Sequence, residues 1–145
     1  MKNLKRQAIE QRSRARRQLL QALYQWQISG GDLWSVRRNR IIDPKAGDID
    51  DDYYFDTAFN TISEKRDLYD TRIAEHTRRK PSTLDPVERA ILWIGVYELL
   101  ERFDIHPTVT INEAIELAKQ FNAEDGYKYI NATLDQLGKT LRPNN

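Results

Sequence analysis

The segment 85–100 constrains the fold more than any other part of the sequence. It begins with Asp85-Pro86-Val87-Glu88, which supplies an N-cap carboxylate, a proline at the first helical position and an acid at the third. Apolar side chains then surround the helix on nearly every side, namely Ala90, Ile91, Leu92, Trp93, Ile94, Val96, Leu99 and Leu100. A helix without a polar face has to be covered by its neighbours. We therefore predict that this helix is the central, most buried one.

Helical periodicity also marks the first half of the chain. In 9–29 the core stripe of an amphipathic helix contains Ala15, Leu19, Ala22, Leu23 and Trp26. Gly30-Gly31 ends that helix, and Asp32 is placed to cap a short second helix. A further helix is predicted over 55–73, because Phe55, Ala58, Phe59, Ile62, Tyr69 and Ile73 recur at helical spacing.

Two more helices are expected near the C-terminus. The pattern Thr110-Ile111-Asn112-Glu113 resembles a capping box, and the helix that it starts is expected to stop at Asn122. The last helix is predicted over 125–138. No stretch alternates apolar and polar residues as a strand would. The sequence thus predicts an all-α fold of about six or seven helices without an internal repeat, in a single domain that covers 1–145.

Positive charge is concentrated at the start of the chain. Residues 1–17 carry a net charge of +6, and because the whole chain carries +1, the remainder carries −5. The basic side chains are Lys2, Lys5, Arg6, Arg12, Arg14, Arg16 and Arg17. Such segregated charge is typical of a helix face that binds nucleic acid or another anionic surface. The alternative is a solvated basic terminus without a partner.

The first predicted helix has a second apolar stripe. Leu20, Tyr24 and Ile28 lie roughly 150° from the core stripe, beside Ser13 and Arg17. A helix needs only one apolar face for its own core. The second stripe is therefore either packed under another helix of the same domain or exposed for a protein partner.

Several functional classes are disfavoured by composition. The chain contains no cysteine, which excludes disulfides and thiol catalysis and favours the cytoplasm. Its longest apolar run, 90–97, is far shorter than the roughly 20 residues of a membrane-spanning helix. No apolar signal segment follows the basic N-terminus, so no contact with a membrane is expected.

No catalytic or metal-binding motif stands out. His76 and His106 have no ligand at metal-binding spacing. The acids at 48, 50 and 52 have the first spacings of a calcium loop, but Tyr53 stands where glycine is needed and Phe59 where glutamate is needed. Phosphate loops and nucleophile elbows are also missing. We expect a protein that is not an enzyme and uses neither a metal nor a cofactor.

Three sets of motifs resemble the NusB family. The first is Asn112-Glu113-Ala114-Ile115-Glu116-Leu117-Ala118-Lys119, followed by Phe121, Lys128, Tyr129-Ile130-Asn131 and Leu134-Asp135. The second is the arginine-rich run that leads into Gln21-Ala22-Leu23-Tyr24-Gln25-Trp26-Gln27. The third is Val87-Glu88-Arg89-Ala90-Ile91-Leu92 with Tyr97-Glu98-Leu99. The resemblance covers essentially the whole chain and is weakest between about 30 and 80.

The resemblance implies a NusB-like fold of two small helical bundles. It also implies a transcription antitermination factor that binds the boxA element of ribosomal RNA leader transcripts together with the ribosomal protein NusE. The complex would join the RNA polymerase elongation complex with other Nus factors and promote processive elongation without catalysis. For the free protein, monomer and homodimer remain alternatives.

The resemblance also assigns site residues. Its RNA-binding positions correspond to Arg12, Arg14, Arg16, Arg17 and Lys128, because guanidinium and ammonium groups bind phosphates and bases. Its partner-binding positions correspond to Tyr24 and Glu88, and the second stripe adds Leu20 and Ile28. Further candidates for RNA contact lie next to Lys128 in the sequence, namely Tyr127, Tyr129 and Asp125.

Each of these assignments has a simpler alternative. Lys128 is equally compatible with a solvated lysine without a ligand, and Tyr129 with packing in the core. Asp125 and Glu88 are compatible with capping their own helices. The chain also departs from the family pattern at Ser13, at Gly126 and at Ala132-Thr133.

The rival function is that of a stand-alone helical RNA-binding or protein-interaction module. Such a module would be related to the RNA-binding domain of ribosomal RNA cytosine methyltransferases. Those enzymes need catalytic cysteines, which this chain does not contain.

Overall fold

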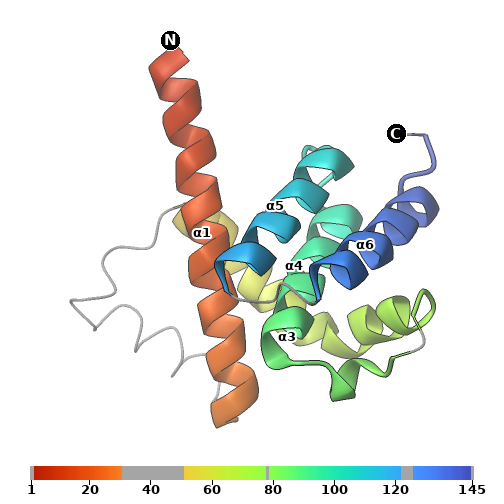
Figure 1. Ribbon diagram of the computed structural model, residues 1–145. Coiled ribbons are helices and arrows are strands. Elements are labelled where there is room, and N and C mark those ends of the chain that lie inside the picture. Colours follow the sequence, from red (N-terminus) through yellow and green to blue (C-terminus); the bar gives the residue numbers. More distant parts are fainter. Residues whose placement is uncertain (1, 31–50, 78, 122–125, 145) are drawn as a thin grey trace. The chain divides into compact units, whose positions relative to one another are not determined.

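The computed structural model describes residues 2–30, 51–77, 79–121 and 126–144 (Figure 1). Within them the protein is entirely helical, which confirms the predicted all-α class. The elements are α1 (Lys2–Ser29), α3 (Asp52–Ala74), a 3₁₀ turn (Pro81–Thr83), α4 (Pro86–Glu101), α5 (Pro107–Gln120) and α6 (Tyr127–Leu141). The short helix expected from Asp32 lies outside the described residues. The chain divides into two compact units, 1–63 and 64–145.

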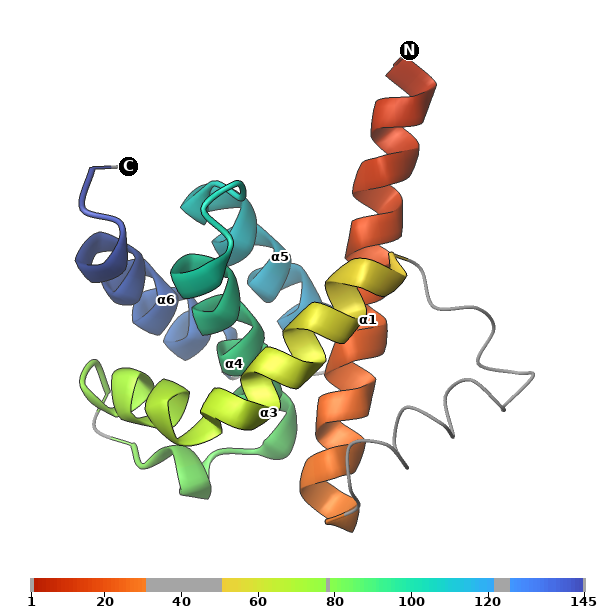
Figure 2. The same ribbon diagram turned by 180° about the vertical axis from the view of Figure 1, so that it is seen from behind.

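In the first unit, α1 packs against the beginning of α3 (Figure 2). Four residues of the predicted core stripe of α1 are buried, namely Ala15, Leu19, Ala22 and Leu23, and Trp26 is half-buried. Helix α3 contributes Tyr54, Phe55, Ala58, Phe59 and Ile62. Trp26 meets Phe59 edge to face with ring centroids 6.4 Å apart, and Phe55 stacks on Phe59 at 5.8 Å. These aromatic contacts fix how the two helices pack in this unit.

Helix α1 begins at Lys2, earlier than the predicted start at Ile9. Residues 3–11 are all exposed, so no buried stripe marks them in the sequence. Lysine, arginine, glutamine and leucine are good helix formers, and no proline or glycine interrupts the segment. The basic N-terminal segment is therefore part of a helix rather than an irregular terminus.

Helix α3 is one segment with a break. Lys65 has non-helical backbone angles, φ −105° and ψ 16°. The break lies next to the boundary between the units, which falls after Ser63. The second half of α3 belongs to the second unit, where it supplies Tyr69, Asp70 and Ile73.

In the second unit, α4 is the central helix, as predicted. Every residue from Ala90 to Leu99 is buried, and α5 and α6 pack against α4 and against each other. A methyl group on Gly95 would lie 2.6 Å from Cδ2 of Leu134, so α4 and α6 approach closely there. Asp70 accepts hydrogen bonds from Trp93 Nε1 at 2.8 Å and from Arg89 Nη2 at 2.5 Å.

The start of α5 differs from the prediction. The helix begins at Pro107 rather than Thr110, because His106 caps it: Nδ1 of His106 accepts from the Thr108 amide at 3.1 Å. Thr110 lies inside the helix and donates from its hydroxyl to Oε1 of the buried Glu98 at 2.8 Å. The end is near the predicted Asn122, at Gln120.

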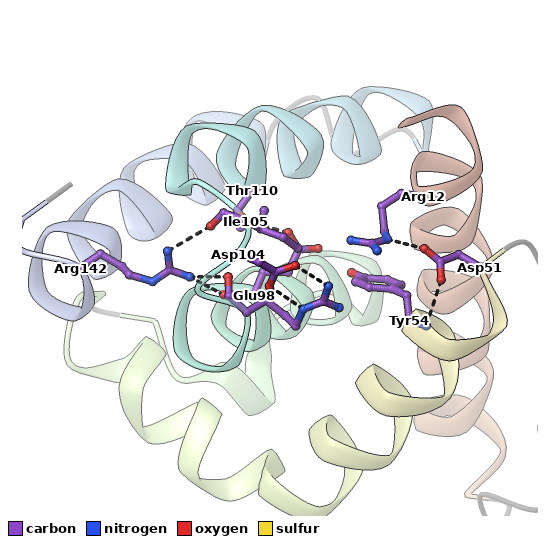
Figure 3. Close-up of polar contacts among 9 residues, drawn as sticks. Arg12, Asp51, Tyr54, Glu98, Asp104, Ile105, Thr110 and Arg142 are labelled. Carbon is purple, nitrogen blue, oxygen red and sulfur yellow. Dashed lines mark hydrogen bonds and ion pairs between the residues drawn. The ribbon is translucent and has the colours of Figure 1, made fainter. Parts of the chain in front are cut away.

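Helix α6 runs from Tyr127 to Leu141 and passes through Gly138, where the prediction ended it. Arg142 follows, and its guanidinium is buried at the carboxyl end of α4 (Figure 3). It donates to the carbonyl oxygens of Glu98, Leu99, Arg102 and Ile105 at 2.7 to 3.0 Å. One side chain thus binds four carbonyl groups at and just beyond the carboxyl end of α4, where helix geometry leaves carbonyl groups short of partners. Two of these carbonyls, those of Glu98 and Arg102, also accept backbone amides.

Candidate RNA and partner surfaces

Two of the predicted RNA-binding arginines are held against the N-terminus of α3. Arg12 donates from Nε to Oδ2 of Asp51 at 2.6 Å, and its guanidinium lies 4.7 Å from the centroid of the Tyr54 ring (Figure 3). Arg16 lies over the same ring at 5.7 Å and is only 3% exposed. A buried guanidinium stabilises the packing of α1 against α3 and has little surface to offer a ligand.

Asp51 organises this contact from the other side. Its Oδ1 accepts from the Tyr54 amide at 3.2 Å, so the carboxylate caps α3 while it pairs with Arg12. Asp51 adopts φ +50°, a left-handed conformation that aspartate tolerates better than most residues. Asp51 is thus the acid that caps α3.

The other two arginines of the motif are more accessible. Arg14 is exposed and Arg17 is half-buried. Lys5 and Arg6 are also exposed on the preceding turns of α1. In the first unit, the accessible basic surface therefore runs from Lys5 to Arg17 and excludes Arg16.

The residues of the second apolar stripe of α1 differ in exposure, so they do not form one exposed surface. Tyr24 is 42% exposed and Ile28 is 61% exposed, whereas Leu20 is only 1% exposed. Leu20 is therefore a residue of the interior, the first of the two alternatives for the stripe. Tyr24 and Ile28 remain accessible to a partner.

A second cluster surrounds Glu88 in the second unit. Nη1 of Arg79 lies 3.9 Å from Oε2 of Glu88, and its guanidinium lies 5.0 Å from the centroid of the Tyr129 ring. The Glu88 carboxylate also touches Gly126 so closely that a methyl group there would overlap it. Lys128 is exposed on the adjoining turn of α6, and the Tyr129 hydroxyl is buried.

Arg79 was not among the predicted site residues, and neither was Tyr54. Arg79 stands in a connection with no periodic pattern, so nothing in the sequence links it to Glu88 or Tyr129. The burial of Arg16 did leave a signal: Leu19, Leu20 and Leu23 follow it at i+3, i+4 and i+7, the spacing of one helix face. Asp125 lies outside the described residues.

The described part of the chain shows no group of three or more His, Cys, Asp or Glu side chains that could hold a metal ion. None of the helices described is long and apolar enough to cross a membrane.

These features define a class: an all-helical protein of two compact units whose first helix presents basic side chains. Comparison with known proteins is more specific. The NusB family model matches residues 13–139. The chain belongs to the NusB family.

Relatives and a solved structure agree. The chain is 40% identical over 131 residues to a transcription antitermination protein NusB from Pseudoalteromonas atlantica, covering 90% of this chain and 93% of the relative. The NusB of Alcanivorax borkumensis is also 40% identical over 131 residues, with 90% and 87% covered. A solved structure of T. maritima NusB superimposes with a TM-score of 0.78 at 31% identity, covering 88% of this chain and 90% of that one. The resemblance seen in the sequence is confirmed.

Proposed function

We propose that this chain is a transcription antitermination factor. It binds boxA RNA of ribosomal RNA leader transcripts together with the NusE ribosomal protein, and promotes processive elongation by RNA polymerase in a complex with other Nus factors. The observation that carries the proposal is the match, over nine-tenths of the chain, to relatives named transcription antitermination proteins. The activity takes place in the bacterial cytoplasm and requires no catalysis, metal or cofactor.

The basic surface of α1 supports the RNA part of this proposal. Arg14, Arg17 and the partly exposed Arg12 lie on one helix and can reach several phosphates of a single strand. Lys128 adds an exposed cation on α6. In this proposal Arg16 acts by packing on Tyr54, which holds the helix that carries the other arginines.

Tyr24, Ile28 and Glu88 are the proposed contacts with the protein partner. Tyr24 combines an apolar ring with a hydroxyl and is substantially exposed, which suits an interface. Leu20 is left out because it is buried. The rival function, a stand-alone module, is disfavoured because the alignments cover 93% and 87% of the relatives' own lengths. We therefore propose that residues 1–145 act as one RNA-binding domain.

A titration tests the proposal. A single-stranded boxA oligonucleotide and a scrambled oligonucleotide of the same length are titrated with the protein, with and without NusE, at several salt concentrations. We expect preferential binding of boxA that becomes tighter with NusE. If about four to six phosphates are contacted, log affinity should fall against log salt with a slope of about −3 to −4. Equal affinity for the two oligonucleotides in the presence of NusE would contradict the proposal.

A further inference from the structure

Arg79 lies between two residues that are candidates for contact with different ligands. On one side is Glu88, a proposed contact with the protein partner, with 3.9 Å between Nη1 and Oε2. On the other is Tyr129, an aromatic candidate for contact with RNA, with 5.0 Å from the guanidinium to the ring centroid. All three residues belong to the second unit.

Glu88 is the fixed member of this group. Its side chain is 15% exposed, and it stands on the first turn of α4, where a negative charge is favoured by the helix dipole. Its carboxylate also rests on Gly126, at the N-terminus of α6, where a side chain would overlap it. Two helix ends therefore keep this carboxylate in place.

Arg79 is the member that can change its ligand. Its side chain is 59% exposed, and 3.9 Å is an ion-pair distance but too long for a hydrogen bond. Its backbone is anchored locally, since its amide donates to Oγ1 of Thr77 at 3.1 Å. A guanidinium presents donors in its plane while its face stacks on an aromatic ring. Arg79 can thus bind a phosphate without leaving Tyr129.

We infer that Arg79 is a further RNA contact whose availability Glu88 controls. In the free protein, Glu88 attracts the guanidinium and lowers its affinity for phosphate. When a cationic group of the protein partner pairs with Glu88, Arg79 turns its donors to the RNA. Partner binding and RNA binding are then coupled through one side chain, and each increases the affinity for the other by the same factor. This inference rests on the proposed function.

The test is a double-mutant cycle on RNA affinity. The full chain and its variants Glu88→Gln, Arg79→Ala and the double variant are titrated with fluorescent boxA and scrambled oligonucleotides without partner. Glu88→Gln should raise the affinity by about two- to fivefold, the range that exposed ion pairs span, and Arg79→Ala should lower it. In the Arg79→Ala background, Glu88→Gln should have little effect.

Three controls separate this coupling from simpler effects. Asp135→Asn also removes an acid from an ion pair in the second unit, with Lys139 at 3.3 Å, and should change RNA affinity less than Glu88→Gln. Arg79→Lys keeps the charge without the planar group and should recover only part of the affinity. Thermal unfolding of each variant identifies any loss of folding. With NusE present, Arg79→Ala should reduce the gain in RNA affinity that NusE produces.

The outcomes distinguish this inference from the proposed function. If boxA is preferred but Glu88→Gln gives the same gain with and without Arg79, or no gain, the coupling is wrong and the proposed function stands. If the two oligonucleotides bind alike even with NusE present but the cycle shows coupling, the antitermination proposal fails and the coupling stands. A wild-type chain that binds neither oligonucleotide would contradict both.

Discussion

Arg12 and Asp51 form a short ion pair, 2.6 Å from Nε to Oδ2, that joins the basic helix α1 to the N-terminus of α3. Their side chains are 26% and 24% exposed, so the pair is partly shielded from water. The arginine-rich motif therefore divides into residues that hold α1 in place and residues that remain accessible. This division can be measured.

Arg14→Ala and Arg16→Ala should have different effects. Arg14 is exposed, so its replacement should lower RNA affinity and reduce the salt slope by about 0.7, the contribution of one phosphate on a single strand, with little change in stability. Arg16 is buried against Tyr54, so its replacement should lower the free energy of unfolding by about 1 to 3 kcal/mol. Urea unfolding and oligonucleotide titration measure the two effects. Similar losses of stability in both variants would contradict the division.

Tyr24→Asp should weaken binding of the protein partner and leave cooperative thermal unfolding intact, because Tyr24 is 42% exposed. Leu20→Asp, one helical turn away, is the matched control. Leu20 is 1% exposed, so an unpaired carboxylate there should destabilise the protein severely. Loss of cooperative unfolding in the Tyr24 variant would show that Tyr24 belongs to the core instead.

Gly95→Ala and Gly138→Ala should change stability in opposite directions. Alanine favours a helix by up to about 1 kcal/mol over glycine, and at Gly138 the nearest neighbouring atoms would be 3.9 Å from the new methyl group. At Gly95 the methyl group would lie 2.6 Å from the buried Leu134, and such overpacking costs about 1 to 3 kcal/mol. Chemical unfolding of both variants tests this contrast. Equal stabilisation would mean that α4 and α6 do not approach closely at Gly95.

Stability should fall above pH 10. Burial raises the pKa of the Tyr69 hydroxyl above its ordinary value of 10.0. Between the unfolded and folded pKa values the unfolded chain releases this proton and the folded chain retains it, so the free energy of unfolding decreases as pH rises. One such proton contributes up to about 1.4 kcal/mol per pH unit.

Tyr69→Phe should make that decrease shallower and leave stability near pH 7 almost unchanged, because the buried hydroxyl has no hydrogen-bond partner among the described residues. Urea unfolding at several pH values between 8 and 12 measures the slope for both proteins. Identical slopes would assign the alkaline loss to other groups, such as Tyr97, whose pKa burial also raises.

The sequence predicts local features of this fold better than distant contacts. Helix α4 could be located because its N-cap, its proline and its continuous apolar surface all lie within one segment. The start of α5 was missed because histidine is an uncommon N-cap, whereas Thr110 fits a capping pattern. The structural role of Arg142 could not be predicted, because the carbonyl groups that it binds are about forty positions earlier in the chain.

The candidate surfaces show the same limit. Helical periodicity separates Tyr24 from the core stripe of α1. It does not predict that Leu20 and Arg16 are buried too, because their burial depends on the residues that pack against α1. Arg79 contacts Glu88 across a connection without helical periodicity and contacts Tyr129 from a distant part of the sequence. Only the folded chain brings such residues together.

Transcription through a terminator tests the central claim most directly. RNA polymerase transcribes a template that carries a leader with boxA upstream of a terminator, in the presence of the other Nus factors and NusE, with and without this protein. We predict that adding the protein increases readthrough on the boxA template and that scrambling boxA removes the increase. Readthrough that is unchanged by the protein, or raised equally on both templates, would contradict the proposed antitermination function.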